Sequence, residues 1–193
     1  MNTQLKVYGG KFMAQSLDIK KQIEEEYGKV VYSYATHQYC ANNLLLTDKK
    51  LKICEIVVSG LITAGLVSLI AKYYLISTIV STILSLILVI ISSLLKAGDY
   101  QLKAYKHSQT ALDLWNIREK YLSLLTDFEK LSESEVRNRR NMLLDETKTI
   151  YSYEERTNDK AYKRAQKALK DEEYQFFTRE ELNILLPEYL RHD

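Results

Sequence analysis

The side chains that most often do chemistry in proteins are few in this sequence and far apart. Its three histidines are His37, His107 and His192, and its two cysteines are Cys40 and Cys54. A structural zinc site needs about four such ligands at short, recurring spacings. His37 with Cys40 supplies at most half of one, so we expect the histidines to have surface or helix-face roles. The sequence predicts no metal, no cofactor and no catalytic set, and therefore no enzyme.

One acidic residue, Glu55, stands at the edge of a long apolar block. Ionisable residues at membrane depth are functional candidates by default. Two interpretations are open. Glu55 is either an ordinary interfacial glutamate whose carboxylate reaches water, or one member of a charged ring at the mouth of a pore.

Hydroxyl and small side chains recur inside the same block. Ser77, Ser81 and Ser85 fall every four residues and so share one helical face. A stripe of small residues that would let another helix approach closely precedes them, at Gly60, Ala64, Ser68 and Ala71, with Thr63 adjacent to it. These residues either pack helices together and bond to carbonyls of their own helix, or line a polar path through an assembly of several copies.

Two transmembrane helices explain the apolar block. Between residues 56 and 95 the only charged residue is Lys72. The 21 residues 75–95 carry no charge, and at about 1.5 Å per residue they extend roughly 31 Å, the thickness of a hydrocarbon core. Residues 54–71 form a shorter span, and only residues 72–74 separate the two. We expect an antiparallel hairpin with its turn at headgroup depth.

Flanking lysines orient this hairpin. They precede the first span and follow the second, at Lys49, Lys50, Lys52, Lys96, Lys103 and Lys106. The turn carries a single lysine, so the positive-inside rule places both arms and both termini in the cytoplasm. A hairpin buried in a soluble core would need far more surrounding protein than these arms supply.

The arms have the pattern of amphipathic helices. Apolar spacing predicts one or two helices over residues 15–50, and a helix over 96–130 that runs directly on from the second span. Ser132 and Glu135 form a capping-box pattern. Shorter helices are predicted over residues 132–151, 157–173 and 178–187. We therefore predict an all-α membrane protein with a cytoplasmic arm (1–52), a transmembrane hairpin (53–95) and a cytoplasmic helical region (96–193) continuous with the hairpin.

Composition argues against several functions. The formal net charge is +2, and basic residues alternate with acidic ones along the predicted helices. Nucleic-acid binding needs a clustered basic surface, so we expect none. Gly9, Gly10, Gly28 and Gly98 do not follow strands, so no phosphate-binding loop is indicated.

This layout resembles the SLATT superfamily of bacterial two-transmembrane effector proteins. The similarity rests on Ser85-Leu86-Ile87-Leu88-Val89, on His107, Ala111, Leu114-Trp115 and Arg118-Glu119, and on the tail segments at residues 165–169 and 185–191.

The resemblance implies a homo-oligomeric effector of antiphage defence in the bacterial inner membrane. It would perforate or depolarise that membrane and cause abortive infection when a sensor partner, such as a cyclic-nucleotide synthetase or a reverse transcriptase, signals. Membrane lipid and other copies of the chain are the partners expected. The alternative is a membrane-anchored scaffold that recruits a cytosolic enzyme without forming a pore.

Overall fold

The computed structural model describes residues 2–68, 74–172, 174, 177–185, 187 and 191, with side chains described from Leu17 onward except at residues 66–73 and 183. All regular structure in these residues is helical, which confirms the all-α part of the predicted fold class. The helices are α1 (Asn2–Ser68), α2 (Tyr74–Gly98), α3 (Tyr100–Thr126), the short 3-10 helix η1 (Phe128–Lys130), α4 (Glu133–Tyr153), α5 (Asp159–Asp171) and α6 (Arg179–Leu185).

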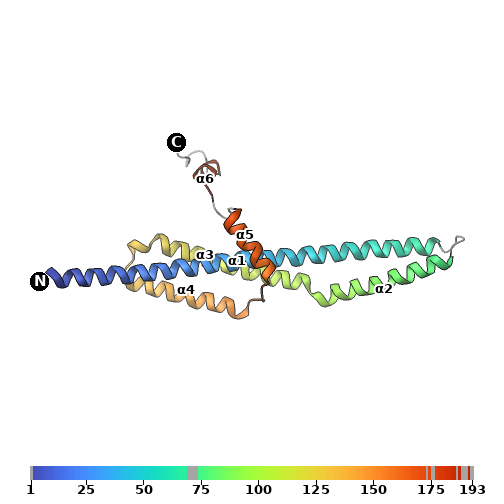
Figure 1. Ribbon diagram of the computed structural model, residues 1–193, viewed down its shortest axis with the longest axis horizontal. Helices are drawn as coiled ribbons and strands as arrows, with labels where there is room; N and C mark the ends of the chain where they lie inside the picture. Colours follow the sequence, from blue (N-terminus) through green and yellow to red (C-terminus); the bar gives the residue numbers. More distant parts are fainter. Residues whose placement is uncertain are drawn as a thin grey trace.

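The longest element, α1, forms the axis of the molecule (Figure 1). Its 67 residues extend roughly 100 Å, because no proline interrupts them and the three described glycines from Gly28 onward are tolerated inside a helix. The first predicted arm and the first predicted span are therefore one continuous helix. The two ends of α1 nevertheless have different surroundings.

At one end, α1 and α2 lie side by side and run antiparallel (Figure 1). Ser92 of α2 contacts Glu55 of α1, and Ser77, which is 15 positions nearer the turn, contacts Gly65. Residue numbers therefore fall along one helix as they rise along the other. Residues 69–73, which hold the end of the first predicted span and its turn, lie outside the described residues.

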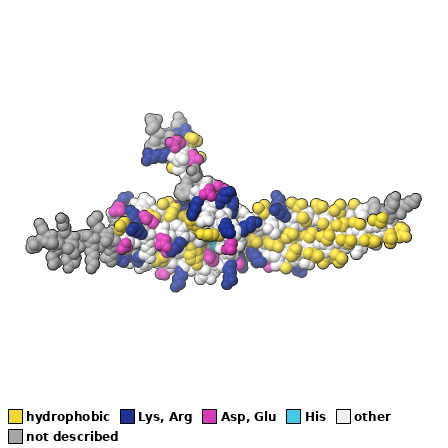
Figure 2. Space-filling view, in the orientation of Figure 1, with side chains coloured by type: hydrophobic (Ala, Val, Ile, Leu, Met, Phe, Trp, Pro, Cys, Tyr) yellow, Lys and Arg dark blue, Asp and Glu magenta, His cyan; other side chains and the backbone are white. Residues whose placement is uncertain are grey.

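Only one stretch of the described chain, Tyr74–Thr126, meets the length and composition expected of a membrane-crossing helix. Its apolar part is α2, and only 6% of that window is buried. Figure 2 shows apolar side chains covering this end and charged ones gathered on the rest of the molecule. The apolar side chains of α2 face outward, which is the opposite of a core helix in a soluble protein. No second described helix meets the same criteria of length and composition, so the second predicted span is not shown.

A sharp break separates α2 from α3, where the sequence predicted one uninterrupted helix. Asp99 adopts the left-handed conformation with φ 46° and ψ 36°. Asp is among the few residues that tolerate this conformation. A Cβ on Gly98 would lie 2.3 Å from the Tyr100 ring, so only glycine fits there without a shift. The helix direction therefore changes where the apolar helix pair meets the charged bundle.

The charged end is a bundle of α1, α3 and α4. Its core consists of apolar side chains from all three helices, among them Ile23, Val30, Leu114, Leu143 and Ile150. Each large side chain of this kind contributes roughly 1.5–3 kcal/mol when fully buried. Trp115 is half-buried against Tyr34, with ring centroids 5.1 Å apart.

The later helices begin close to where the sequence placed them. Ser132 caps α4 in a complete capping box with Glu135, as predicted. Asn158, one residue after the predicted Thr157, caps α5 by accepting a hydrogen bond from the amide of Ala161. Helix α5 then crosses α1 obliquely (Figure 1), and its buried alanines, such as Ala165, allow that close crossing. Helix α6 follows at a distance from the bundle.

Candidate functional site

Two of the predicted hydroxyl residues face α1. The Oγ of Ser77 donates a hydrogen bond of 2.7 Å to the carbonyl oxygen of Gly65. Ser81 is buried, and a Cβ on Gly65 would lie 2.6 Å from its Oγ. Among the described residues this Oγ has no hydrogen-bond partner. The two helices therefore approach most closely at Gly65, a residue that the predicted small-residue stripe did not include.

The other predicted residues of the block point away from this contact. Ser85 and Thr63 donate to carbonyl oxygens of their own helices, on Ser81 and Ser59, at 2.8 and 3.0 Å. Gly60 and Ala64 are exposed, and no side chain would meet a Cβ on Gly60 within 4 Å.

Glu55 is held across the helix pair. The Oγ of Ser92 donates to its Oε1 at 2.5 Å. The carboxylate is half-buried between α1 and α2, so it neither extends freely toward water nor stands alone on the outer surface. A hydrogen bond to a charged group is one of the stronger kinds, and here it ties the two helices together near their bundle end.

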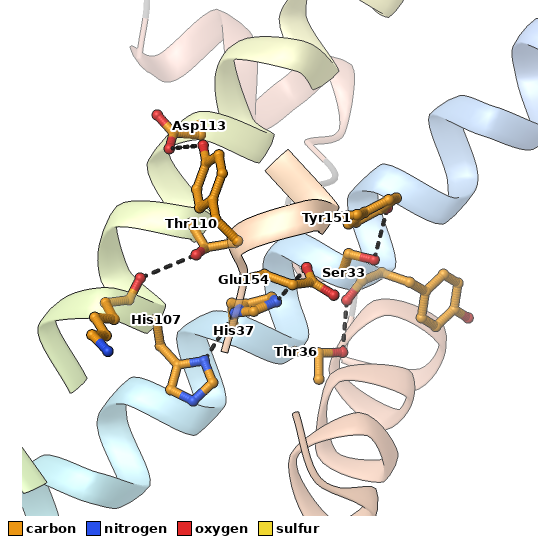
Figure 3. Close-up of polar contacts among 11 residues, drawn as sticks. Ser33, Thr36, His37, His107, Thr110, Asp113, Tyr151 and Glu154 are labelled. Atoms are coloured by element: carbon orange, nitrogen blue, oxygen red, sulfur yellow. Dashed lines mark hydrogen bonds and ion pairs between the residues drawn. The ribbon is translucent and has the colours of Figure 1, made fainter. Parts of the chain in front are cut away.

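The bundle contains a buried polar cluster that sequence reasoning missed. His37 on α1 and His107 on α3 are 1% and 5% exposed, and their Nδ1 atoms lie 2.9 Å apart (Figure 3). The Nε2 of His37 lies 3.2 Å from Oε2 of Glu154, the residue at the C-terminal end of α4. Of the surface or helix-face roles expected for them, neither histidine is at the surface, and both lie on buried faces of their helices. His192 lies outside the described residues.

This contact restricts where protons can reside. One Nδ1 must donate and the other must accept, so both rings cannot be imidazolium ions while they keep it. Both contacts are hydrogen bonds when His107 donates from Nδ1 to His37 and His37 donates from Nε2 to the Glu154 carboxylate. Burial and, to a smaller extent, the neighbouring His107 lower the pKa of His37 to about 4.

Burial also shifts the pKa values of the other two members of the cluster. Burial lowers the pKa of His107, against a smaller upward effect of Glu155, and burial raises the pKa of Glu154. Desolvation disfavours the charged form of each group. Burial therefore favours the neutral form of each member of the hydrogen-bonded contact that joins the three helix segments.

Further polar contacts surround the segment that follows α4. Lys106 pairs with Glu155 at 2.7 Å, and the Asn158 amide lies 3.6 Å from the buried Sγ of Cys40. Tyr151 bonds to Ser33 at 3.1 Å (Figure 3). The connection between α4 and α5 is thus attached to both α1 and α3.

Metal binding gains no support from this cluster. In the part of the chain that the structure describes, no group of three or more His, Cys, Asp or Glu side chains is placed to hold a metal ion. The available geometry suits proton-dependent hydrogen bonding instead.

A signal for burial of the histidines did exist in the sequence. His37 continues the buried series of Val30 and Ala41 along α1, at spacings of seven and four, and His107 lies between the buried Ala104 and Ala111. Such periodicity predicts that a position faces the core. It cannot show which residue of another helix lies opposite.

Comparison with known proteins gives one match. Residues 19–181 match the family described as SMODS and SLOG-associating 2TM effector domain family 4. No curated protein and no solved structure matches the chain.

Proposed function

Because the chain belongs to the SMODS and SLOG-associating 2TM effector domain family 4, we propose that it is a bacterial membrane effector that oligomerises and permeabilises the inner membrane. Membership confirms the resemblance inferred from the sequence and implies a two-transmembrane effector of conflict systems. In the proposal α1 and α2 both cross the bilayer, and the bundle and both termini are cytoplasmic. A partner sensor triggers opening and so causes abortive infection.

The observation that supports a pore is a difference between the two lateral faces of the helix pair. Four exposed hydroxyl residues each come one position after a residue that faces the partner helix. Ser59 and Thr63 follow Val58 and Ile62 on α1. Thr78 and Thr82 follow Ser77 and Ser81 on α2.

One position along a helix is a rotation of about 100° in a fixed sense. In two neighbouring antiparallel helices, this rotation places the residue that follows a contact residue on the same lateral side of the pair, whichever helix carries it. The hydroxyl groups of Ser59, Thr63, Thr78 and Thr82 therefore share one lateral face, which we call the hydroxyl face. Ser85, one position after the half-buried Leu84, extends it.

The opposite lateral face is apolar. The residues one position before the same contact residues are Val57, Leu61, Ile76 and Val80, and all are about half exposed or more. Lipid suits that face. In an assembly of several copies, hydroxyl faces turned inward would surround a polar path, and apolar faces would meet lipid or neighbouring copies. The predicted lining thus shifts from Ser77 and Ser81 to their neighbours.

The trigger would act through the bundle. A ligand or partner opens the assembly only if it binds the open state more tightly, and about 5.5 kcal/mol of differential affinity converts a 1:99 equilibrium to 99:1. Helix α1 runs without interruption from the bundle into the helix pair, so a change in bundle packing reaches the spans directly.

Dye and ion leakage from liposomes that contain the purified chain tests the proposal. Thr63→Val with Thr82→Val removes two hydroxyls without changing side-chain shape, and we expect ion conductance to fall at unchanged oligomer size. The matched control, Leu61→Ile with Val80→Ile on the apolar face, should conduct normally. Correctly inserted protein that never leaks, with or without its genomic neighbours' products, would leave the membrane-anchored scaffold as the better explanation.

A further inference from the structure

A groove runs along the bundle between α3 and α4. One part of it has a volume of about 310 Å³, and its lining includes Lys120, Leu124, Arg139, Met142, Leu143 and Glu146. Met142 is 63% exposed although it is apolar. Arg139 lines the groove one helical turn after Glu135, and the two side chains interact electrostatically. The groove therefore presents an uncovered apolar strip beside a positive charge.

Helix α6 carries the complementary pattern. Ile184 and Leu185 are 72% and 69% exposed, among the most exposed large apolar residues of the described chain. Glu180 and Glu181 lie one helical turn before them and so flank the same side. Although short, the helix is capped, because Thr178 accepts a hydrogen bond from the Glu181 amide and Glu181 accepts one from the Thr178 amide.

The two patterns match in order as well as in chemistry. On α4, Arg139 lies one turn before Met142 and Leu143. On α6, the two glutamates lie one turn before Ile184 and Leu185. A helix aligned parallel to α4 would place acidic side chains beside Arg139 and apolar ones on Met142 and Leu143.

We propose that the groove between α3 and α4 binds α6 of a second copy of this chain. This inference rests on the self-association in the proposed function and names the contact that produces it. Tail helices exchanged in this way link one copy to the next, since each copy offers both a groove and a helix.

The arrangement of the bundle favours a second copy over the helix's own groove. Helix α5, which leads to α6, packs on α1. In Figure 1 α6 lies on the side of α1 opposite α4. Because Ile184 and Leu185 are mostly exposed, α6 does not occupy the groove of its own copy.

Disulfide trapping between differently tagged copies tests the proposal. Cys54 is replaced by serine, and the buried Cys40 is kept. One copy carries Met142→Cys and the other carries Leu185→Cys, and the two are mixed in detergent or lipid nanodiscs and oxidised. We expect a heterodimer, in at least about tenfold excess over the control pair, because a docked helix raises the effective concentration of its cysteine.

The control pair combines Met142→Cys with Arg179→Cys, which lies on the opposite side of α6 from Ile184. Equal trapping by both pairs, or no trapping by either, overturns the proposal. The proposal is also overturned if a chain carrying both Met142→Cys and Leu185→Cys forms only an internal disulfide.

Charge reversal gives an independent check that needs no cysteine. Arg139→Glu should reduce the oligomer fraction at low salt, and Glu180→Arg in the same chain should restore it. Restoration fails if α6 does not approach α4. If liposomes leak but no dimer is trapped, this inference is overturned and the proposed pore is retained. If a dimer is trapped but liposomes do not leak, the proposed pore is overturned and this inference is retained.

Discussion

The Nδ1 atoms of His37 and His107 lie 2.9 Å apart, although 70 residues separate the two histidines in the chain. The contact connects α1 to α3, and Glu154 adds the end of α4 through the other ring nitrogen of His37. Only one ring can keep a proton between the facing nitrogens. Protonation of both rings would place two like charges in a buried contact and push the helices apart.

Acidification should therefore weaken the bundle. In the fold the pKa of His37 is about 4, below its ordinary value of 6.5, so its contribution to stability is complete above pH 6.5 and is lost as the pH falls toward 4. The loss is at most about 3 kcal/mol, and the lowered pKa of His107 acts in the same direction. The raised pKa of Glu154 offsets part of it, because its protonation favours the fold.

Denaturant unfolding of the detergent-solubilised chain at pH 7.5 and pH 5 measures this dependence. The matched variant is His37→Gln with His107→Gln, which removes both titrating rings. We expect its unfolding free energy to vary much less between the two pH values. An equal pH dependence in the parent and the variant would assign the effect to other groups.

The two histidines should also be energetically coupled. His107→Ala leaves a buried nitrogen of His37 without its partner, which typically costs about 1–3 kcal/mol. Once His37→Ala is present, the same change should cost clearly less, so the double-mutant cycle should give a coupling of at least about 0.5 kcal/mol. Strictly additive losses would mean that the contact does not contribute to stability.

Gly65 should be the glycine on which the helix pair depends. Gly65→Ala brings a methyl group against Ser81 Oγ and should destabilise the pair by about 1 kcal/mol or more, as overpacking does. Adding Ser81→Ala removes the clashing atom and should restore stability. Gly60→Ala, where a Cβ meets nothing within 4 Å, is the control and should be neutral or stabilising. SDS titration in micelles measures all four chains.

The hydrogen bond from Ser92 to Glu55 gives a further test of the helix pair. Ser92→Ala removes the donor and should destabilise the pair by roughly 1.5–3 kcal/mol, the usual range for a bond to a charged group. Ser93→Ala is its neighbour and control, because Ser93 is exposed and donates only to Val89 of its own helix. If the two variants melt alike in detergent, the contact across the pair has no stabilising role.

Local sequence signals determined most of the helical architecture. The lack of proline before Pro187 and the regular apolar spacing predicted the long helices. The capping box at Ser132 and Glu135 predicted the start of α4 to the residue. These features act between residues three or four positions apart, so they are readable from a single chain. The apolar block likewise indicated the helix pair, since its charge pattern is local.

What the tertiary structure decided depends on how helices face one another. Periodicity placed Ser77, Ser81 and Ser85 on one side of a helix, but only packing against Gly65 shows that Ser77 and Ser81 point at α1. The hydroxyl face follows from the antiparallel direction of two helices together. His37 and His107 meet for the same reason: helix rotation and register are set by the summed packing of many side chains, which no local pattern records.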